Sequence, residues 1–99
     1  MKQLLIATLL FATTACNAFA EDDPDLALLP EDPFREDVFY MCSACHSIKT
    51  VTQQRLNRHR WDETLEWMVE EGGMAELDPE EREPLLDYLT TYFGEDAPR

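Results

Sequence analysis

The segment Cys42-Ser43-Ala44-Cys45-His46 holds the residues best suited to chemistry: two thiols three positions apart, with an imidazole directly after the second. Such a segment could form a redox-active disulfide, contribute ligands to a zinc site, or hold a haem through covalent bonds to both sulfur atoms. The three possibilities imply different surroundings for the segment. The rest of the sequence must therefore decide between them.

The first two possibilities find little support elsewhere in the chain. A thioredoxin-like disulfide follows a strand within a βαβ unit, and no part of this sequence alternates apolar and polar residues as a strand does. A closed zinc site needs four ligands. The chain offers Cys42, Cys45, His46 and the distant His59, and three tetrahedral ligands from one short segment are sterically awkward.

The covalent haem agrees best with the segment, because Cys-x-x-Cys-His is the attachment signature of c-type haem. Thiols three positions apart on a helical turn face the same way and can bond the two vinyl groups at one edge of the porphyrin. His46 would then present a ring nitrogen to the iron. One covalent haem c would also supply core to a short chain, since domains of this size are marginal without a staple or a large cofactor.

A second axial ligand opposite His46 would decide whether the iron transfers electrons or binds a further molecule. Histidine with methionine is the ligand pair of electron-carrying cytochromes c. Met74 follows two glycines in a loop between expected helices, where it could fold over a haem face, and we take it as the distal ligand. Met68 lies on the apolar face of an expected helix and is the second choice. Met41 lies on the attachment side, and His59 stands beside arginines.

The first 20 residues have the three parts of a secretory signal peptide. Lys2 precedes an apolar run over 4–12, and Ala18-Phe19-Ala20 has the small-residue pattern of a cleavage site. The run is too short to span a bilayer, which takes about 20 apolar residues, so we expect no transmembrane segment in the mature chain. Cleavage after residue 20 places the protein in the periplasm and removes Cys16, whose alternative use would be a lipid anchor.

The charge of the chain restricts its partners. The sequence has 21 Asp and Glu against 8 Lys and Arg, a formal net charge of −13. This balance argues against nucleic acid and anionic membranes, which bind basic surfaces, and it suits a basic partner protein. The segment 38–61 is different, because it has no acid but contains Lys49, Arg55, Arg58 and Arg60. Haem propionates are anions that this segment could hold, although pairing with the acidic helices would also account for it.

The chain divides into a leader, a lead-in and one helical domain. We expect residues 21–33 to form an acidic, proline-containing extended lead-in with little structure of its own. Residues 34–99 would then form the haem domain. Its first helix should have Asp32 as N-cap and Pro33 at its first position, and should continue through residue 47.

Two further helices follow from their capping residues and apolar faces. The second should follow Asn57 and stop at Gly72, and the third should follow Asp78 and end at Gly94. The expected buried residues are Trp61, Leu65, Met68 and Val69 in the second and Leu85, Leu86, Leu89 and Phe93 in the third. The sequence therefore predicts a small all-α domain of three main helices wrapped around one covalent haem.

The order of these features resembles that of small class I-type c-type cytochromes. A helix with Cys-Ser-Ala-Cys-His, a second helix, a loop methionine and a last helix with the aromatic-Leu pair Tyr88-Leu89 match that family over nearly all of the mature chain. The segment "HSIKTVTQQRLNRHRWDETLEWMVEEGGM" is most similar to short cytochrome subunits of periplasmic dehydrogenases, including those of the sulfite dehydrogenase type. The resemblance implies thioether bonds at Cys42 and Cys45, with His46 as the proximal ligand and Met74 as the distal one.

The resemblance implies an electron carrier rather than an enzyme, with a redox partner protein such as a periplasmic dehydrogenase. It also implies an arginine and a tryptophan at a haem propionate, for which the candidates are Arg55, Arg58, Arg60 and Trp61, although Trp61 could equally be a core residue. If Met74 did not bind the iron, the chain would be a haem protein with an open sixth position. It would then bind a small gas or act as a peroxidase or sensor, with distal donors from the segment 58–60.

Two positions depart from the family pattern. Phe34 stands where the family has a glycine at the crossing of the first and last helices, so we expect a wider or displaced crossing. No proline lies between His46 and Pro79, whereas the family holds its proximal histidine with a proline carbonyl after the motif. The hydrogen-bond partner of His46 must therefore differ, and such partners tune the metal.

Overall fold

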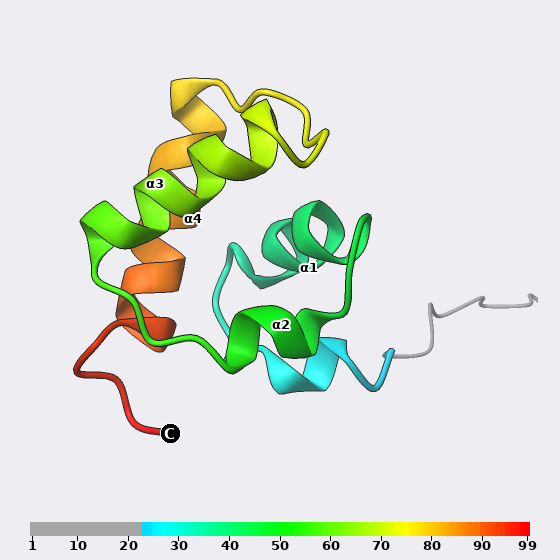
Figure 1. Ribbon diagram of the computed structural model, residues 1–99. Helices are drawn as coiled ribbons and strands as arrows, with labels where there is room; N and C mark the ends of the chain where they lie inside the picture. The colour runs from blue at the N-terminus through cyan, green and yellow to red at the C-terminus, as the bar shows by residue number, and fades with distance from the viewer. Residues whose placement is uncertain (1–22) are drawn as a thin grey trace, which may run out of the picture.

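Figure 1 shows the computed structural model of the chain, which describes residues 23–99 and has helices as its only regular elements there. The predicted signal peptide over 1–20, with Cys16, lies outside the described residues. The elements are a 3-10 turn at Leu26–Leu28 (η1) and the helices α1 at Arg35–Ser43, α2 at Ile48–Thr52, α3 at Arg58–Glu70 and α4 at Pro79–Phe93. The all-α prediction is confirmed for this part of the chain, which has one short helix more than expected. Within the same range, no helix is both long and apolar enough for a membrane span.

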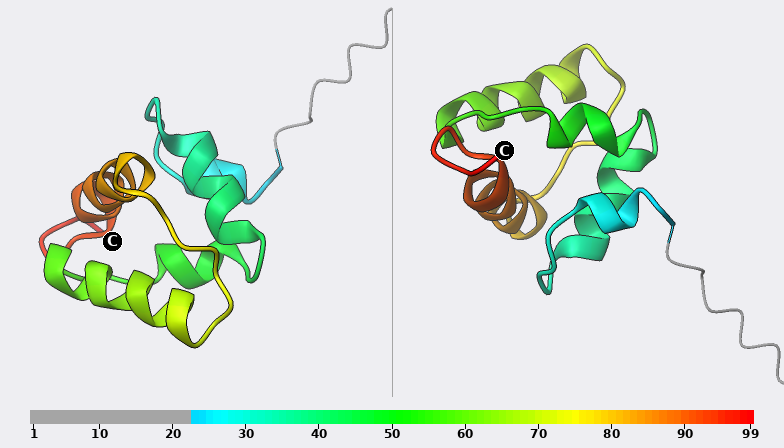
Figure 2. Two further views of the ribbon diagram at one scale, coloured as in Figure 1. Left: turned by 90° about the horizontal axis from the view of Figure 1, so that it is seen from above. Right: turned by 90° about the horizontal axis from the view of Figure 1, so that it is seen from below.

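The helices form two groups. α3 packs closely against α4, and α2 packs against both α1 and η1. The views from above and below show α3 and α4 together on one side of the molecule, with α1, α2 and η1 on the other (Figure 2). α1, which carries Cys42, belongs to one group, and the two longest helices, α3 and α4, form the other.

The helix that carries the first cysteine is shorter than predicted. Asp32 still turns the chain, because its Oδ1 accepts from the Phe34 amide at 2.9 Å and its carbonyl accepts from the Arg35 amide at 3.0 Å. The helix itself begins at Arg35, two residues after the expected start, and ends at Ser43. Cys45 and the histidine after it thus lie in a turn beyond α1, and the prediction of one helix through residue 47 is wrong.

The cause of this early end is a helix that the prediction missed. Ser47 has an extended conformation (φ −66°, ψ 141°), and its side chain accepts from the Lys49 amide at 3.2 Å, so it caps α2. A residue cannot be an extended cap of one helix and an interior residue of another. Ile48 and Val51, one turn apart in α2, are both buried, which fixes this short helix against the core.

The two long helices begin and end as predicted. Asn57 caps α3 by accepting a hydrogen bond from the Arg60 amide at 2.9 Å. Asp78 caps α4 in the same way, accepting from the Glu81 amide at 3.1 Å, with Pro79 as the first helical residue. Gly94 follows the last residue of α4, and a Cβ there would clash with a carbonyl oxygen of the preceding turn.

The residues before α1 are more structured than predicted. Leu29 follows η1 and is 2% exposed, so it belongs to the core. The Arg35 guanidinium donates twice to the Leu26 carbonyl, at 2.6 and 3.2 Å, and the Tyr88 hydroxyl donates to the Pro30 carbonyl at 2.7 Å. The expected extended lead-in with little structure of its own is wrong for this segment, because a buried leucine and the hydrogen bonds from Arg35 and Tyr88 anchor it.

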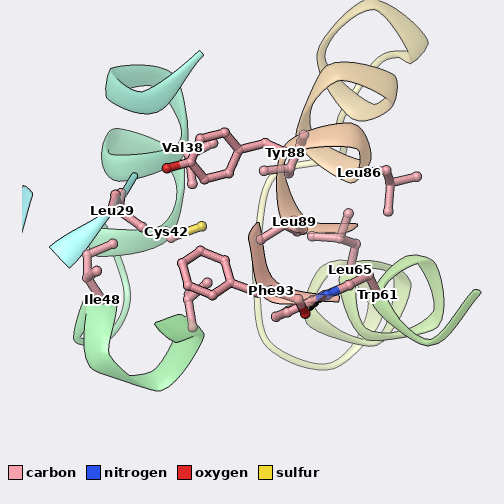
Figure 3. Close-up of a cluster of buried hydrophobic side chains, with 12 residues drawn as sticks. Leu29, Val38, Cys42, Ile48, Trp61, Leu65, Leu86, Tyr88, Leu89 and Phe93 are labelled. Carbon is pink, nitrogen blue, oxygen red and sulfur yellow. Dashed lines mark hydrogen bonds between the residues drawn. The ribbon is translucent and has the colours of Figure 1, made fainter. Parts of the chain in front are cut away.

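Both groups contribute to one hydrophobic core (Figure 3). Tyr88 points from α4 toward α1, where Val38 is fully buried. The Trp61 ring is buried in α3, and its Nε1 donates to the Phe93 carbonyl at 3.0 Å, which ties the start of α3 to the end of α4. Most of the predicted apolar faces are buried, at Trp61, Leu65, Leu85, Leu86, Leu89 and Phe93. Met68 and Val69 are only half-buried.

Phe34 lies where the wider helix crossing was expected. Its ring is half-buried and packs against the core just before α1. The most extensive backbone contacts join α3 with α4, and α2 with its two neighbours, so the pair α1–α4 has a smaller contact. The wider or displaced crossing of the first and last helices stays a prediction.

The cap of α4 offers a test of the fold. Asp78→Ala removes the acceptor for the Glu81 amide, and loss of such a cap costs about 1 kcal/mol of stability. Glu76→Ala, two residues earlier in the same exposed loop, removes the same charge without removing a cap and should change the free energy of unfolding by less than about 0.5 kcal/mol. Urea unfolding followed by far-ultraviolet circular dichroism measures both. Equal losses in the two variants would contradict the assigned start of α4.

Candidate functional site

An apolar cavity of about 490 Å³ is lined by residues of both helix groups. Its size lies within the usual range of ligand and cofactor pockets, about 300–1,000 Å³. All four α-helices and the three segments that connect them contribute to it. The lining residues with sulfur or imidazole atoms are Met41, Cys42, Cys45, His46, Met68 and Met74. Every predicted attachment and ligand residue therefore lines the same cavity.

The two thiols have different surroundings. Cys42 lies in the last turn of α1 and is 8% exposed, and burial raises its pKa from 9.0 to about 11. Cys45 lies in the turn beyond the helix and is exposed. The Cys42 thiol is thus protonated at neutral pH, whereas cysteines that exchange disulfides have lowered pKa values. Both cysteines are free and line the cavity.

His46 has a backbone partner that the sequence did not identify. Its Nδ1 lies 3.1 Å from the carbonyl oxygen of Ser47, so a proton on Nδ1 can be donated to that oxygen. This tautomer leaves the lone pair on Nε2, the arrangement found in metal-binding histidines whose other nitrogen donates to a carbonyl. Ser47 also caps α2, and its conformation is thereby fixed. The residue before α2 thus supplies a carbonyl within hydrogen-bond distance of the His46 ring.

The loop after α3 returns Met74 to the cavity. The Met68 carbonyl accepts from the amides of both Gly72 and Met74, each at 3.0 Å, so the chain folds back over the end of the helix. Gly73 has φ +75°, a conformation that L-residues rarely adopt, and a Cβ on Gly72 would lie 2.8 Å from the Met68 carbonyl oxygen. Two adjacent glycines are therefore needed for the fold-back that brings both methionines to one cavity.

The structure does not bring the predicted arginines to the cavity. Arg58 forms ion pairs with Glu83 at 2.7 Å and Asp87 at 2.6 Å, and the pKa of its guanidinium is raised chiefly by the hydrogen bond to Asp87. Arg60 lies 3.9 Å from a carboxylate of α3, and neither arginine is among the cavity lining. Pairing with the acidic helices, the alternative left open by the sequence, accounts for both of these residues.

The two tryptophans of α3 both line the cavity. Trp61 is a core residue with its indole nitrogen bonded to the Phe93 carbonyl, so that nitrogen is already used. Trp67 is 61% exposed and lies at the mouth, where Cys45 and Gly72 are also exposed. The cavity therefore opens to solvent beside an indole ring.

Some lining residues were missed because the element that carries them was missed. Thr50 and Val51 come from α2, which the sequence signalled only through a serine before an Ile-x-x-Val pair. Leu56 was also missed; its amide donates to the Phe93 carbonyl at 3.0 Å, a contact between distant parts of the chain. His59, the least favoured ligand candidate, has a side chain that is 79% exposed, and its Nε2 lies 3.2 Å from Oε1 of Glu63.

The sulfur and nitrogen atoms around the cavity suit the three groups considered from the sequence, a zinc ion, a redox disulfide and a covalent haem, to different degrees. Within residues 23–99, no three His, Cys, Asp or Glu side chains gather as a metal ion would require, so a zinc site of four protein ligands does not fit there. No strand is present in the same range, so the setting of a thioredoxin-like disulfide is absent from it. Two thiols, one imidazole and thioethers around an apolar cavity do fit a covalently bound haem in the chemistry of their donors.

Comparison of the chain with protein-family models, with curated proteins and with solved structures finds no match. The resemblance to class I-type cytochromes therefore stays a prediction.

The fold-back after α3 can be tested at Gly73. Gly73→Ala should lower the free energy of unfolding by about 1–2 kcal/mol, because a Cβ disfavours positive φ by that amount. Gly73→Asn is the matched control, since asparagine tolerates the left-handed region better than other side chains, and it should cost less. Chemical unfolding of the three proteins provides the comparison. A larger loss for asparagine than for alanine would contradict the assigned conformation.

Proposed function

We propose that this chain is a periplasmic monohaem c-type cytochrome that transfers single electrons and does not itself transform a substrate. The observation that carries the proposal is that one apolar cavity is lined by Cys42, Cys45, His46 and Met74, which come from α1, the turn after it and the loop before α4. A covalently bound haem c would supply one-electron transfer at its iron. The residues of the chain would attach it, ligate it and exclude water from one side of it.

Each of the four residues has a distinct part in the proposal. Cys42 and Cys45 would hold the haem through thioether bonds, the first from a buried position and the second from the exposed edge of the cavity. His46 would hold the iron through Nε2, with its Nδ1 proton donated to the Ser47 carbonyl. Met74 would be the second iron ligand, and Met68 is the second choice because its side chain lines the same cavity.

The cavity lining favours an iron with six ligands rather than an iron with an open sixth position. Gas-binding and peroxidase sites use a distal histidine or arginine to steer the bound molecule. In the part of the chain that the structure describes, the lining contains His46 as its one histidine and no arginine, but it contains three thioethers. The residues 58–60 that would have supplied distal donors pair instead with carboxylates outside the cavity.

The partner of such a carrier would be another redox protein. The net charge of −13 suits a partner with a basic contact surface. A periplasmic dehydrogenase that passes electrons to this chain as acceptor or subunit agrees with the predicted export. Transient redox complexes use small interfaces, below about 1,200 Å².

Optical spectra of the exported protein and of two methionine variants test the proposal. We expect the reduced wild type to show the sharp bands of low-spin c-type haem, and the oxidised form to show the weak iron–methionine charge-transfer band. Met74→Ala should lose that band and lower the reduction potential, because a soft thioether ligand raises it.

Met68→Ala is the matched control, because it removes a thioether from the same cavity but keeps the backbone carbonyl that receives the Met74 amide. This variant should retain the charge-transfer band. Loss of the band in Met68→Ala alone would make Met68 the ligand. A high-spin wild type whose spectrum shifts with carbon monoxide would contradict the electron carrier and support the open-site alternative.

A further inference from the structure

The exposure of Trp67 needs an explanation, because this large apolar side chain lines the cavity and yet faces solvent. Three large apolar residues of the described chain are prominently exposed, Leu28 at 42%, Tyr40 at 65% and Trp67 at 61%. Of these three, Trp67 alone lines the cavity, and it lies at the mouth beside exposed Cys45 and Gly72. Exposed tryptophan is a residue type that often anchors protein–protein contacts.

The neighbours of Trp67 on α3 are acidic. In a helix the residues three and four positions away lie beside a side chain, and for Trp67 these include Glu63, Glu70 and Glu71, with Glu66 adjacent in the chain. Glu63 is taken up by His59 and Arg60. Within the described chain, no Lys, Arg or His lies within 4.0 Å of the carboxylates of Glu66, Glu70 or Glu71.

These unpaired carboxylates lie toward the C-terminal end of α3, where negative charge destabilises a helix. The C-terminus of a helix carries partial negative charge, so acids there are unfavourable and bases are favourable. The last turn of α3 has no basic residue. Glu76 joins Glu66 and Glu70 at a second depression of about 400 Å³, whose one arginine, Arg82, is paired with Asp62 at 2.7 Å. No cation of the described chain therefore neutralises the negative charge at this end of α3.

We propose that Trp67 and the two unpaired carboxylates beside it, Glu70 and Glu71, form the docking surface for a redox partner whose contact surface has lysine and arginine around an apolar patch. We call this surface the Trp67 face. The inference rests on the proposed function and specifies where its partner binds. A second copy of this acidic chain and an anionic membrane would both be repelled from the Trp67 face.

The Trp67 face suits transfer of electrons for two reasons. It borders the cavity mouth, so a protein bound there would lie next to whatever the cavity holds. Unpaired carboxylates around one aromatic anchor favour fast, salt-dependent association and a small contact area. Both properties are typical of transient redox partners.

Stopped-flow electron transfer from the holoprotein to a lysine-rich cytochrome c, used as a basic probe protein, tests the charge of the Trp67 face. At low ionic strength, Glu70→Gln/Glu71→Gln should slow the second-order rate by about five- to tenfold, because steering by a charged surface changes such rates by about 10–1,000-fold. Glu95→Gln/Asp96→Asn is the control with the same change in net charge. Glu95 contacts Asn57, the cap at the start of α3. That end of the helix is about 15 Å from Trp67 along the helix axis. The control should change the rate by less than about twofold.

A second pair of variants tests the aromatic anchor. Trp67→Ala should slow the reaction at both low and high ionic strength, whereas Tyr40→Ala, which changes an exposed aromatic residue that does not line the cavity, should not. Oxidation by a small uncharged quinone should proceed at the wild-type rate in the charge variants, since it needs no docking. The optical spectrum must match wild type in each case.

Two outcomes would overturn the docking surface alone. One is an equal loss of rate in the two double-charge variants, which would mean that net charge acts without a local surface. The other is a wild-type rate in both Glu70→Gln/Glu71→Gln and Trp67→Ala. A wild-type preparation without a haem spectrum would instead overturn the proposed function, and the docking surface with it.

Discussion

Two tyrosines of α4 hold the helix groups together, and the arrangement of the cavity depends on that join. The Tyr88 hydroxyl donates to the Pro30 carbonyl at 2.7 Å, and the Tyr92 hydroxyl donates to Asp32 Oδ2 at 3.0 Å. Burial raises the pKa of Tyr88, and the hydrogen bond to Asp32 raises that of Tyr92, so both phenols remain donors at physiological pH. Leu89, next to Tyr88 in α4, already lines the cavity. Both hydrogen bonds therefore join α4 to the segment between η1 and α1.

The cavity is continuous with the core rather than separate from it. Cys42, Val51, Trp61, Leu65 and Leu89 belong both to the buried cluster and to the cavity lining. A chain of this length buries a smaller share of its surface than a larger domain does, so an apolar group bound in the cavity would extend the core as well as provide chemistry. In the proposed function, binding the cofactor and completing the fold are therefore linked, as they are in metal-dependent small domains.

The parts of this fold that could be predicted from sequence depend on local signals. Asn57 and Asp78 cap their helices through contacts within three residues. The cysteines, the histidine and the loop methionine that line the cavity were identified from residue type and spacing. The end of α1 was missed because it depends on competition with α2, which Ser47 wins by adopting an extended conformation. The role of Arg58 was open because its carboxylate partners lie more than 20 residues away in the chain. The Ser47 carbonyl as partner of His46 likewise followed only from three-dimensional geometry.

The mass of the exported protein tests the central claim most directly. The chain should be produced with its own signal peptide in a bacterium that attaches c-type haem in its periplasm, and its intact mass should be measured after denaturation. The account predicts the processed chain plus one haem, with no loss of hydrogen, because each thiol adds across a vinyl double bond. It also predicts that Cys42→Ser/Cys45→Ser lacks that mass. A wild-type mass equal to the processed chain alone, or two hydrogens lighter as for a disulfide, would contradict it.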